Sequence, residues 1–257
     1  MSKNNKQILE LLKELRLSAI KEVFKEVTER AEKEEIGYDC FLLELLEKEV
    51  TERNHKRVGR FLRESKLPLE KSMNTFEIKR LPFKTRRVVD HLLVGDFIQR
   101  KENVLAFGKP GSGKTHLLCA IAQELIQIGK RIYFTSCNRL VEYLLKAKKS
   151  LVLESALKKM EKFDAVIIDD IGYVQYSREE MEVLFTFLAQ RYERGSVMLT
   201  SNLPFSKWEQ IFKDPMTTAA AIDRLVHHSV ILELNLESYR MESAKKSKEN
   251  PVEEENE

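Results

Sequence analysis

The first quarter of the chain carries hydrophobic residues at the spacing of helices. From Ile8 onward, apolar residues recur every three or four positions, and a second stretch of this kind runs over Tyr38–Ser65. Pro68 then interrupts the pattern, because proline ends a helix. We therefore predict an all-helical module over residues 1–75, followed by a linker over residues 76–84.

The rest of the chain alternates short apolar runs with helical stretches. The runs lie at 103–107, 131–135, 164–168, 196–200 and 229–234. Such alternation is typical of βαβ units, which form a parallel sheet with helices on both faces. We predict an α/β domain over residues 85–241 with a five-stranded parallel sheet. The polar residues 242–257 predict a disordered tail.

The composition is that of an ordinary globular protein, with 42% hydrophobic and 33% charged residues. The net charge of +3 identifies no partner, but the charges are unevenly distributed. Residues 1–52 hold nine Lys/Arg and thirteen Asp/Glu, a net charge of −4, whereas residues 53–101 hold fourteen and five, a net charge of +9. The second segment is therefore where we look for contact with an anionic partner.

Cysteine usage and hydropathy indicate the compartment. The three cysteines are odd in number and lack the spacing of metal ligands, as expected of reduced thiols. The charged N-terminus has no signal-type apolar stretch, and no run approaches the roughly 20 apolar residues of a membrane helix. We expect a soluble cytoplasmic protein that makes no membrane contact.

A glycine-rich segment after the first predicted strand matches the phosphate-loop pattern G-x-x-x-x-G-K-[ST]. Its glycines let backbone N–H groups surround phosphate oxygens, and the helix that follows adds the positive end of its dipole. Lys114 is placed to reach the β- and γ-phosphates, and Thr115 to ligate Mg²⁺. The predicted nucleotide-binding residues are Gly108, Lys109, Pro110, Gly111, Ser112, Gly113, Lys114, Thr115 and His116.

Polar residues follow two of the predicted strands. The stretch "FDAVIIDDIG" (163–172) ends in Asp169 and Asp170, and "SVMLTSN" (196–202) ends in Asn202. Carboxyl ends of strands face the ligand crevice of an α/β sheet. Asp169 is placed to hold Mg²⁺, Asp170 to polarise an attacking water, and Asn202 to orient it. The plainer interpretation is that these residues lie in solvated turns.

The last predicted strand is flanked by two arginines, Arg224 and Arg240, whose planar guanidinium groups suit phosphate. Spacing alone favours surface ion pairs for both. His227 and His228 have no metal-like partner in the sequence, and we interpret them as structural. For Trp208 we predict a packing role.

Together these motifs resemble the AAA+ ATPases. The forms "IIDDIG", "LTSN", "IDRL" and "SYR" are similar to the branch of the helicase loader DnaC and the transposition helper IstB, and "FLLELLEKEVTERNHKRVGRFLRESKLP" resembles IstB in particular. The resemblance spans roughly residues 8–241. It implies ATP as the nucleotide and a DnaC/IstB-type core without a C-terminal lid domain.

The resemblance also implies roles for individual residues. Asp169 would be the Walker B carboxylate that holds Mg²⁺, and Asp170 would activate water. Asn202 would be the first sensor, Arg224 a finger that acts on the nucleotide of a neighbouring subunit, and Arg240 a second sensor.

Two basic clusters are candidates for contact with DNA phosphates. The first lies on one helical face and comprises Arg53, Lys56, Arg57, Arg60 and Arg63, and the second comprises Lys146, Lys148 and Lys149. The resemblance places the second on an inserted helix that faces DNA. No aromatic residues are interleaved, so we expect weak sequence preference on double-stranded DNA. Each cluster is also compatible with an ordinary solvated face.

The leading functional prediction is a DNA-binding AAA+ ATPase that self-assembles on DNA with ATP and assists a transposase in inserting a mobile element. One alternative is a replicative helicase loader, with the same ATPase and a helicase as its partner. A second alternative is a nucleotide-dependent DNA-binding scaffold with little hydrolysis.

Overall fold

The computed structural model describes residues 3–172, 176–212 and 214–239. Contacts divide the chain into two compact units, Met1–Arg60 and Phe61–Glu257. The sequence places this division later, at residue 75, with a linker over 76–84, and those boundaries stay a prediction. The disordered tail predicted over 242–257 and the absence of a lid domain concern residues outside the described part.

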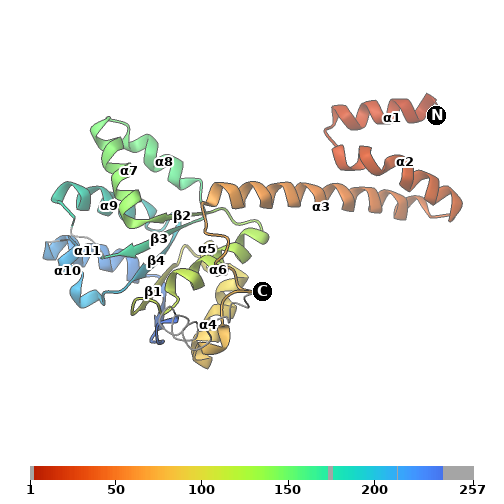
Figure 1. Cartoon of the computed structure of the whole chain (residues 1–257). Helices are drawn as coiled ribbons and strands as arrows, with labels where there is room; N and C mark the ends of the chain where they lie inside the picture. Colours follow the sequence, from red (N-terminus) through yellow and green to blue (C-terminus); the bar gives the residue numbers. More distant parts are fainter. Residues whose placement is uncertain (1–2, 173–175, 213, 240–257) are drawn as a thin grey trace, which may run out of the picture. The chain divides into compact units, whose positions relative to one another are not determined.

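The first unit is helical (Figure 1). It contains α1 (Lys3–Glu14), α2 (Ser18–Lys33) and the first part of α3 (Tyr38–Ser65). Its small core consists of Ile20, Phe24, Val27 and Leu45, against which residues of α1 also pack. The first three of these lie at helical spacing on one face of α2, which explains why that face is buried.

Glu49 of α3 supplies the missing cap of α2. No side chain of the preceding segment caps the N-terminus of this helix. Instead Oε2 of Glu49, a residue only 5% exposed, accepts hydrogen bonds from the backbone N–H groups of Ala19 (2.9 Å) and Ile20 (3.1 Å). Arg53 donates to the other carboxylate oxygen from 2.8 Å. Two otherwise unpaired helix N–H groups are thereby satisfied.

Glu49→Ala is expected to lower the free energy of unfolding of the first unit by about 1–3 kcal/mol, because buried donors lose their acceptor. Burial alone would raise the pKa of Glu49, but the hydrogen bonds from Arg53, Ile20 and Ala19 outweigh it and lower that pKa. A carboxylate with a lowered folded-state pKa stabilises the protein above its unfolded pKa, and this contribution is lost as the pH falls through the folded pKa.

Urea unfolding followed by circular dichroism at neutral and acid pH measures both effects. The control is Glu52→Ala, one turn further along α3, which breaks only a partly exposed pair with Lys56. Equal destabilisation by the two variants, or a Glu49→Ala deficit that persists fully in acid, would contradict the cap.

The second unit contains a five-stranded parallel sheet in the order β2-β3-β4-β1-β5, which confirms the predicted fold class. The strands are β1 (Asn103–Gly108), β2 (Ile132–Ser136), β3 (Ala165–Ile171), β4 (Ser196–Ser201) and β5 (Ser229–Leu234). Because all are parallel, their carboxyl ends meet at one edge of the sheet, and this edge carries the site described below.

Helices cover both faces of the sheet (Figure 1). On one face, α6 (Lys114–Gln127) contacts β1, β2 and β4, and α4 (Phe83–Val94) packs on it. On the other, α7 (Cys137–Lys149) contacts β2 and β3 and adjoins α9 (Arg178–Arg191), which packs on α11 (Pro215–Val226). The shorter elements are η1 (Ile78–Arg80), α5 (Asp96–Gln99), α8 (Leu153–Glu161), η2 (Phe205–Lys207) and α10 (Glu209–Phe212).

The core follows from the apolar strands. Val166 and Ile168 of β3 belong to the cluster formed with α7, α9 and α11, so the alternation of side chains along a strand turns Ile167 toward the α6 face. Trp208 is fully buried and packs near Phe205 and Phe212, in agreement with its predicted packing role. None of the described helices combines the length and the apolar composition needed to cross a membrane.

Candidate nucleotide-binding site

The glycine-rich loop turns sharply between β1 and α6. Its three glycines all have positive φ: 155° at Gly108, 80° at Gly111 and 91° at Gly113. A Cβ at Gly108 would lie only 2.4 Å from the carbonyl oxygen of Leu234 in β5. Side chains are thus excluded both by the backbone conformation and by the space, and the loop is left open for a ligand that approaches its backbone.

Two polar groups inside this loop are nearly buried. Lys114 is 6% exposed, and its Nζ donates to the carbonyl oxygens of Gly108 (2.8 Å) and Lys109 (3.0 Å). Oγ of Ser112 is buried and has no hydrogen-bond partner among the described residues. A buried hydroxyl without a partner costs free energy, which a ligand oxygen in the loop would recover. The loop therefore fits a phosphate group.

A hydroxyl and a carboxylate meet beside the loop. Thr115 and Thr200 each donate a hydrogen bond of 2.7 Å to the same atom, Oδ1 of Asp169. Thr115 begins α6, Asp169 lies near the end of β3, and Thr200 lies in β4, so three elements hold this group together. Hydroxyl and carboxylate oxygens are the ligands that Mg²⁺ prefers, and these residues fit such an ion.

Asp170 lies at an irregularity of β3. Ile168 pairs with Leu199 and Ile171 with Ser201, so two residues of β3 stand opposite one residue of β4, as in a β-bulge. Asp170 has φ 60°, and its backbone N–H donates to Oγ1 of Thr200 from 2.8 Å. The bulge turns this side chain out of the strand, where it is exposed and lines the cavity.

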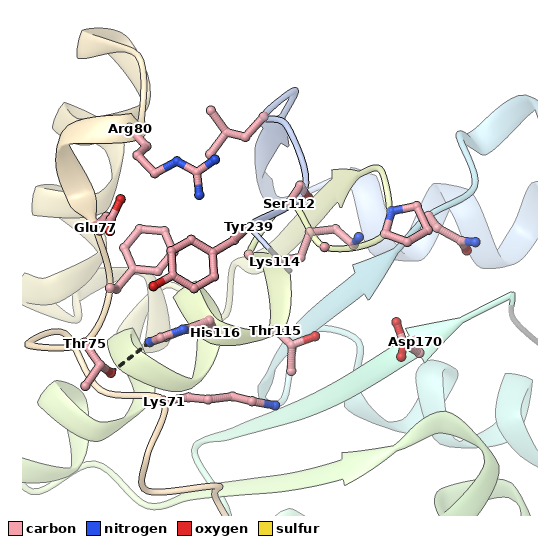
Figure 2. Close-up of a pocket in the computed structure, with 16 residues that line it drawn as sticks. Lys71, Thr75, Glu77, Arg80, Ser112, Lys114, Thr115, His116, Asp170 and Tyr239 are labelled. Carbon is pink, nitrogen blue, oxygen red and sulfur yellow. Dashed lines mark hydrogen bonds between the residues drawn. The ribbon is translucent and has the colours of Figure 1, made fainter. Parts of the chain in front are cut away.

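These groups surround one cavity of about 260 Å³ (Figure 2). The phosphate loop, Asp170 and Asn202 form one part of its wall. The other part comes from residues 71–80, which motif analysis did not assign, and from residues 236–239, which include part of the form "SYR". Their lining residues are Lys71, Thr75, Phe76, Glu77, Arg80, Leu236 and Tyr239.

His116 joins the unassigned segment to the phosphate loop. Its Nε2 lies 3.1 Å from both Oγ1 of Thr75 and the carbonyl oxygen of Ser72, and its ring meets Phe76 edge-on at 5.2 Å (Figure 2). Across the cavity, the guanidinium of Arg80 lies 5.4 Å from the ring centre of Tyr239. In the sequence, Tyr239 belongs to the form "SYR", whereas Phe76 lies in a polar stretch that no motif marks.

The family model for "IstB-like ATP binding protein" matches residues 10–247. The chain belongs to this family. A Sinorhizobium fredii protein described as a "putative insertion sequence ATP-binding protein" is 42% identical over 239 residues, 93% of this chain and 80% of the relative. The "Insertion sequence IS5376 putative ATP-binding protein" of Geobacillus stearothermophilus is 37% identical over 235 residues, 91% of this chain and 94% of the relative.

The fold of this IstB-like chain is also that of replication AAA+ proteins. AMPPCP-bound DnaA from Aquifex aeolicus aligns with 75% of this chain, with a TM-score of 0.54 and 18% sequence identity. The alignment spans 59% of the DnaA chain. At this identity the likeness concerns the fold, and it agrees with the predicted AAA+ core.

Arg224 of the IstB-like chain is not among the residues that line the cavity. It lies near the end of α11, where its Nη1 donates to the carbonyl oxygen of Ala220 from 2.9 Å and its guanidinium covers the ring of Phe185 at 4.9 Å. The structure thus does not bring this arginine together with the other predicted catalytic residues of its own chain. Arg240 lies outside the described residues.

The predicted DNA-contacting residues lie on α3 and α7. Arg53 binds Glu49 and the carbonyl oxygen of Arg16, Lys56 pairs with Glu52, and Lys148 pairs with Glu182. The others are exposed on the helix surfaces: Arg57, Arg60, Arg63, Lys146 and Lys149. Arg57 and Arg60 belong to the first unit, whereas Arg63, Lys146 and Lys149 belong to the second.

Proposed function

We propose that this protein is an ATPase that assembles on double-stranded DNA and assists a transposase in inserting a mobile element. The observation that carries the proposal is the meeting of the phosphate loop, Thr115 and Asp170 at one cavity, with Asp169 hydrogen-bonded to Thr115. The names of its relatives, which are insertion sequence ATP-binding proteins, support the role in transposition over the loading of a helicase.

Binding of ATP begins with the loop. The N–H groups of the loop and the N-terminus of α6 would face the phosphates, with the positive end of the helix dipole toward them. Lys114 would exchange its two carbonyl partners for phosphate oxygens, and Ser112 would gain its missing partner. Thr115 and Asp169 would hold Mg²⁺, which neutralises phosphate charge when bound.

The nucleoside would occupy the part of the cavity formed by residues 71–80 and 236–239. Phe76 and Tyr239 offer apolar ring surface there, and Thr75 and Glu77 offer polar groups. A largely apolar wall with a few polar groups is the usual form of a site for a small ligand. The hydrogen bond between His116 and Thr75 would hold this part of the wall against the first turn of α6.

Hydrolysis requires a water aimed at the γ-phosphate. Asp170, exposed at the cavity, would accept a proton from this water, and Asn202, directly after the neighbouring strand β4, would orient it. The structure supports this assignment because both residues line the cavity beside the loop. Arg224 would act from a neighbouring subunit, since it does not line the cavity of its own chain.

The test of the proposal is calorimetry with Mg²⁺-ATP together with ATP turnover measured with and without duplex DNA. Lys114→Ala should weaken ATP binding about 10- to 100-fold, the range expected for a lost hydrogen bond to a charged group. The control is Lys159→Ala, because this exposed lysine of α8 is not among the residues that line the cavity. Unchanged ATP affinity in Lys114→Ala would reject the site. If the parent protein binds ATP but does not hydrolyse it, the result would favour the nucleotide-dependent scaffold over an ATPase.

Reversal of Arg57 and Arg60 to glutamate should weaken binding to unrelated duplexes equally, because phosphates carry no sequence information. The slope of log K against log salt should fall by about 2, since each phosphate contact contributes about 0.9. Fluorescence anisotropy at several salt concentrations measures both.

The control for this experiment is Lys21→Glu with Lys48→Glu. It makes the same change in charge at exposed positions of α2 and α3 outside the cluster. An equal loss in the control, or a loss confined to one DNA sequence, would argue against contact of Arg57 and Arg60 with the DNA backbone.

A further inference from the structure

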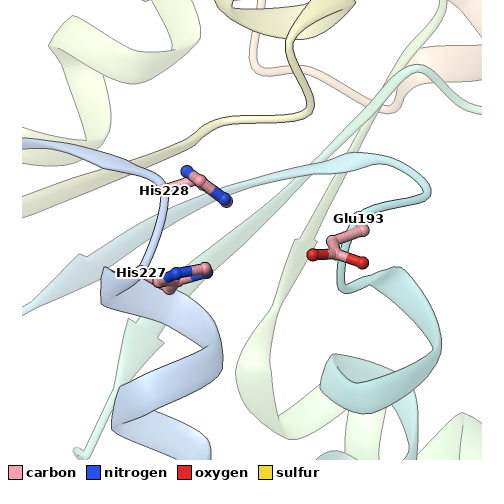
Figure 3. A group of neighbouring side chains, drawn as sticks. All are labelled: Glu193, His227 and His228. Carbon is pink, nitrogen blue, oxygen red and sulfur yellow. The ribbon is translucent and has the colours of Figure 1, made fainter.

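Three metal-binding side chains come together at the edge of the sheet opposite the cavity (Figure 3). Glu193 lies between α9 and β4, and His227 and His228 lie between α11 and β5. One carboxylate oxygen and one nitrogen from each imidazole all lie within 4.8 Å of one another, and all three side chains are exposed. The sequence shows no metal-like partner for the two histidines, because Glu193 lies far from them in the chain and reaches them only through folding.

The turn that carries His227 and His228 is anchored by a buried side chain of β1. Nδ2 of Asn103 donates to the carbonyl oxygen of Leu225 (3.0 Å), and its Oδ1 accepts from the backbone of Val197 in β4 (2.9 Å). The backbone N–H of Asn103 donates to the carbonyl oxygen of His228 from 2.7 Å. One residue thus ties the end of α11 and the start of β4 to β1.

The turn that carries Glu193 is anchored by Arg191. This guanidinium is buried and donates to the carbonyl oxygens of Phe163 (2.8 Å), Asp164 (3.1 Å) and Ser196 (2.9 Å). A Cβ at Gly195 would lie 2.4 Å from it, so the chain passes against the guanidinium. Burial lowers the pKa of Arg191 to about 10, which leaves it charged at neutral pH. Both turns are therefore held in place before any ligand arrives.

The surroundings of the imidazoles suit a metal ion. The hydroxyl of Tyr192 lies 2.9 Å from Nδ1 of His227, which leaves Nε2 of that ring for a ligand bond. Metal-binding histidines usually have such an oxygen partner on their second nitrogen.

We propose that Glu193, His227 and His228 bind one divalent transition-metal ion of the Zn²⁺ type. Two imidazole nitrogens and one carboxylate oxygen form a ligand set that Zn²⁺ accepts, with water in the remaining position, whereas Mg²⁺ and Ca²⁺ require oxygen ligands. The exposed side chains would close around the ion by rotamer changes, since the backbone turns that carry them are fixed. The bound ion would join the turn after α9 to the turn after α11.

The test uses the full-length chain without an affinity tag, in a Cys40→Ser background that removes the exposed thiol. Equilibrium dialysis against zinc chloride, with metal content measured by mass spectrometry, should give one ion per chain. Thermal unfolding should show a higher Tm with zinc, because the ion binds only the folded protein. His227→Ala, His228→Ala and Glu193→Gln should each weaken zinc binding at least about 10-fold.

The matched control is the double variant His55→Ala/His91→Ala, which removes two exposed histidines from α3 and α4. It should bind zinc as the parent does. Equal binding by the parent and a His227→Ala/His228→Ala variant would overturn the proposal, and so would displacement of zinc by excess Mg²⁺ or Ca²⁺. Unchanged circular dichroism and ATP binding in the variants verify folding, and the near-isosteric Glu193→Gln keeps the test valid if a histidine variant fails to fold.

Discussion

Arg224→Ala is expected to reduce ATP turnover by about 10³-fold or more and to leave ATP binding unchanged. The structure provides the reason for this separation. The guanidinium is held by Ala220 and Phe185 on the α9–α11 side of the unit and does not line its own cavity. It therefore cannot affect the binding of nucleotide there, whereas a neighbouring subunit could place it against the γ-phosphate.

Mixing two inactive proteins tests the arrangement between subunits. Arg224→Ala retains an intact cavity and Lys114→Ala retains an intact arginine, so turnover should return at mixed interfaces when DNA is present. Arg194→Ala is the control, because this arginine is exposed in the same unit and is 3.9 Å from Glu161. If mixed oligomers form and stay inactive, Arg224 does not act across an interface.

Asp170→Asn is expected to reduce turnover by about 10²- to 10⁴-fold, the usual contribution of a positioned proton acceptor, and to preserve ATP binding. Asparagine keeps the size of the side chain and tolerates the left-handed conformation at this position. The bulge and the bond from its N–H to Thr200 should therefore persist, and only the proton-accepting carboxylate is lost. Complexes with DNA should become longer-lived, because ATP is not consumed.

Single-turnover kinetics with radiolabelled ATP measures the chemical step directly. The control is Asp223→Asn, an exposed carboxylate on α11 outside the cavity. Turnover at the parent rate in Asp170→Asn would show that another group activates the water.

The sheet could be predicted because buried parallel strands are continuous apolar runs. All five runs became strands, from Asn103–Gly108 to Ser229–Leu234. The phosphate loop could be predicted because its glycines and lysine occupy fixed positions. The bulge at Asp170 could not, since it depends on the hydroxyl of Thr200 in a neighbouring strand, which no local pattern reveals.

Helical spacing gives the direction of a side chain and not its partner. Arg53 and Arg57 lie one turn apart on α3, and the sequence treats them alike. In the structure Arg53 neutralises the buried carboxylate of Glu49, whose burial depends on contact with α2. In the same way, the approach of Glu193 to His227 is a result of tertiary structure.

The polar stretch of residues 71–80 has a practical consequence for dissecting this protein. A fragment that starts at residue 85, where the sequence places the ATPase domain, would retain every nucleotide-binding motif. It would nevertheless lack Phe76, Arg80 and the groups that His116 contacts, and so five of the seven residues that form the second part of the cavity wall. We therefore expect the smallest fragment that distinguishes one nucleoside from another to begin before Lys71, whereas boundaries taken from the motifs alone would exclude this segment.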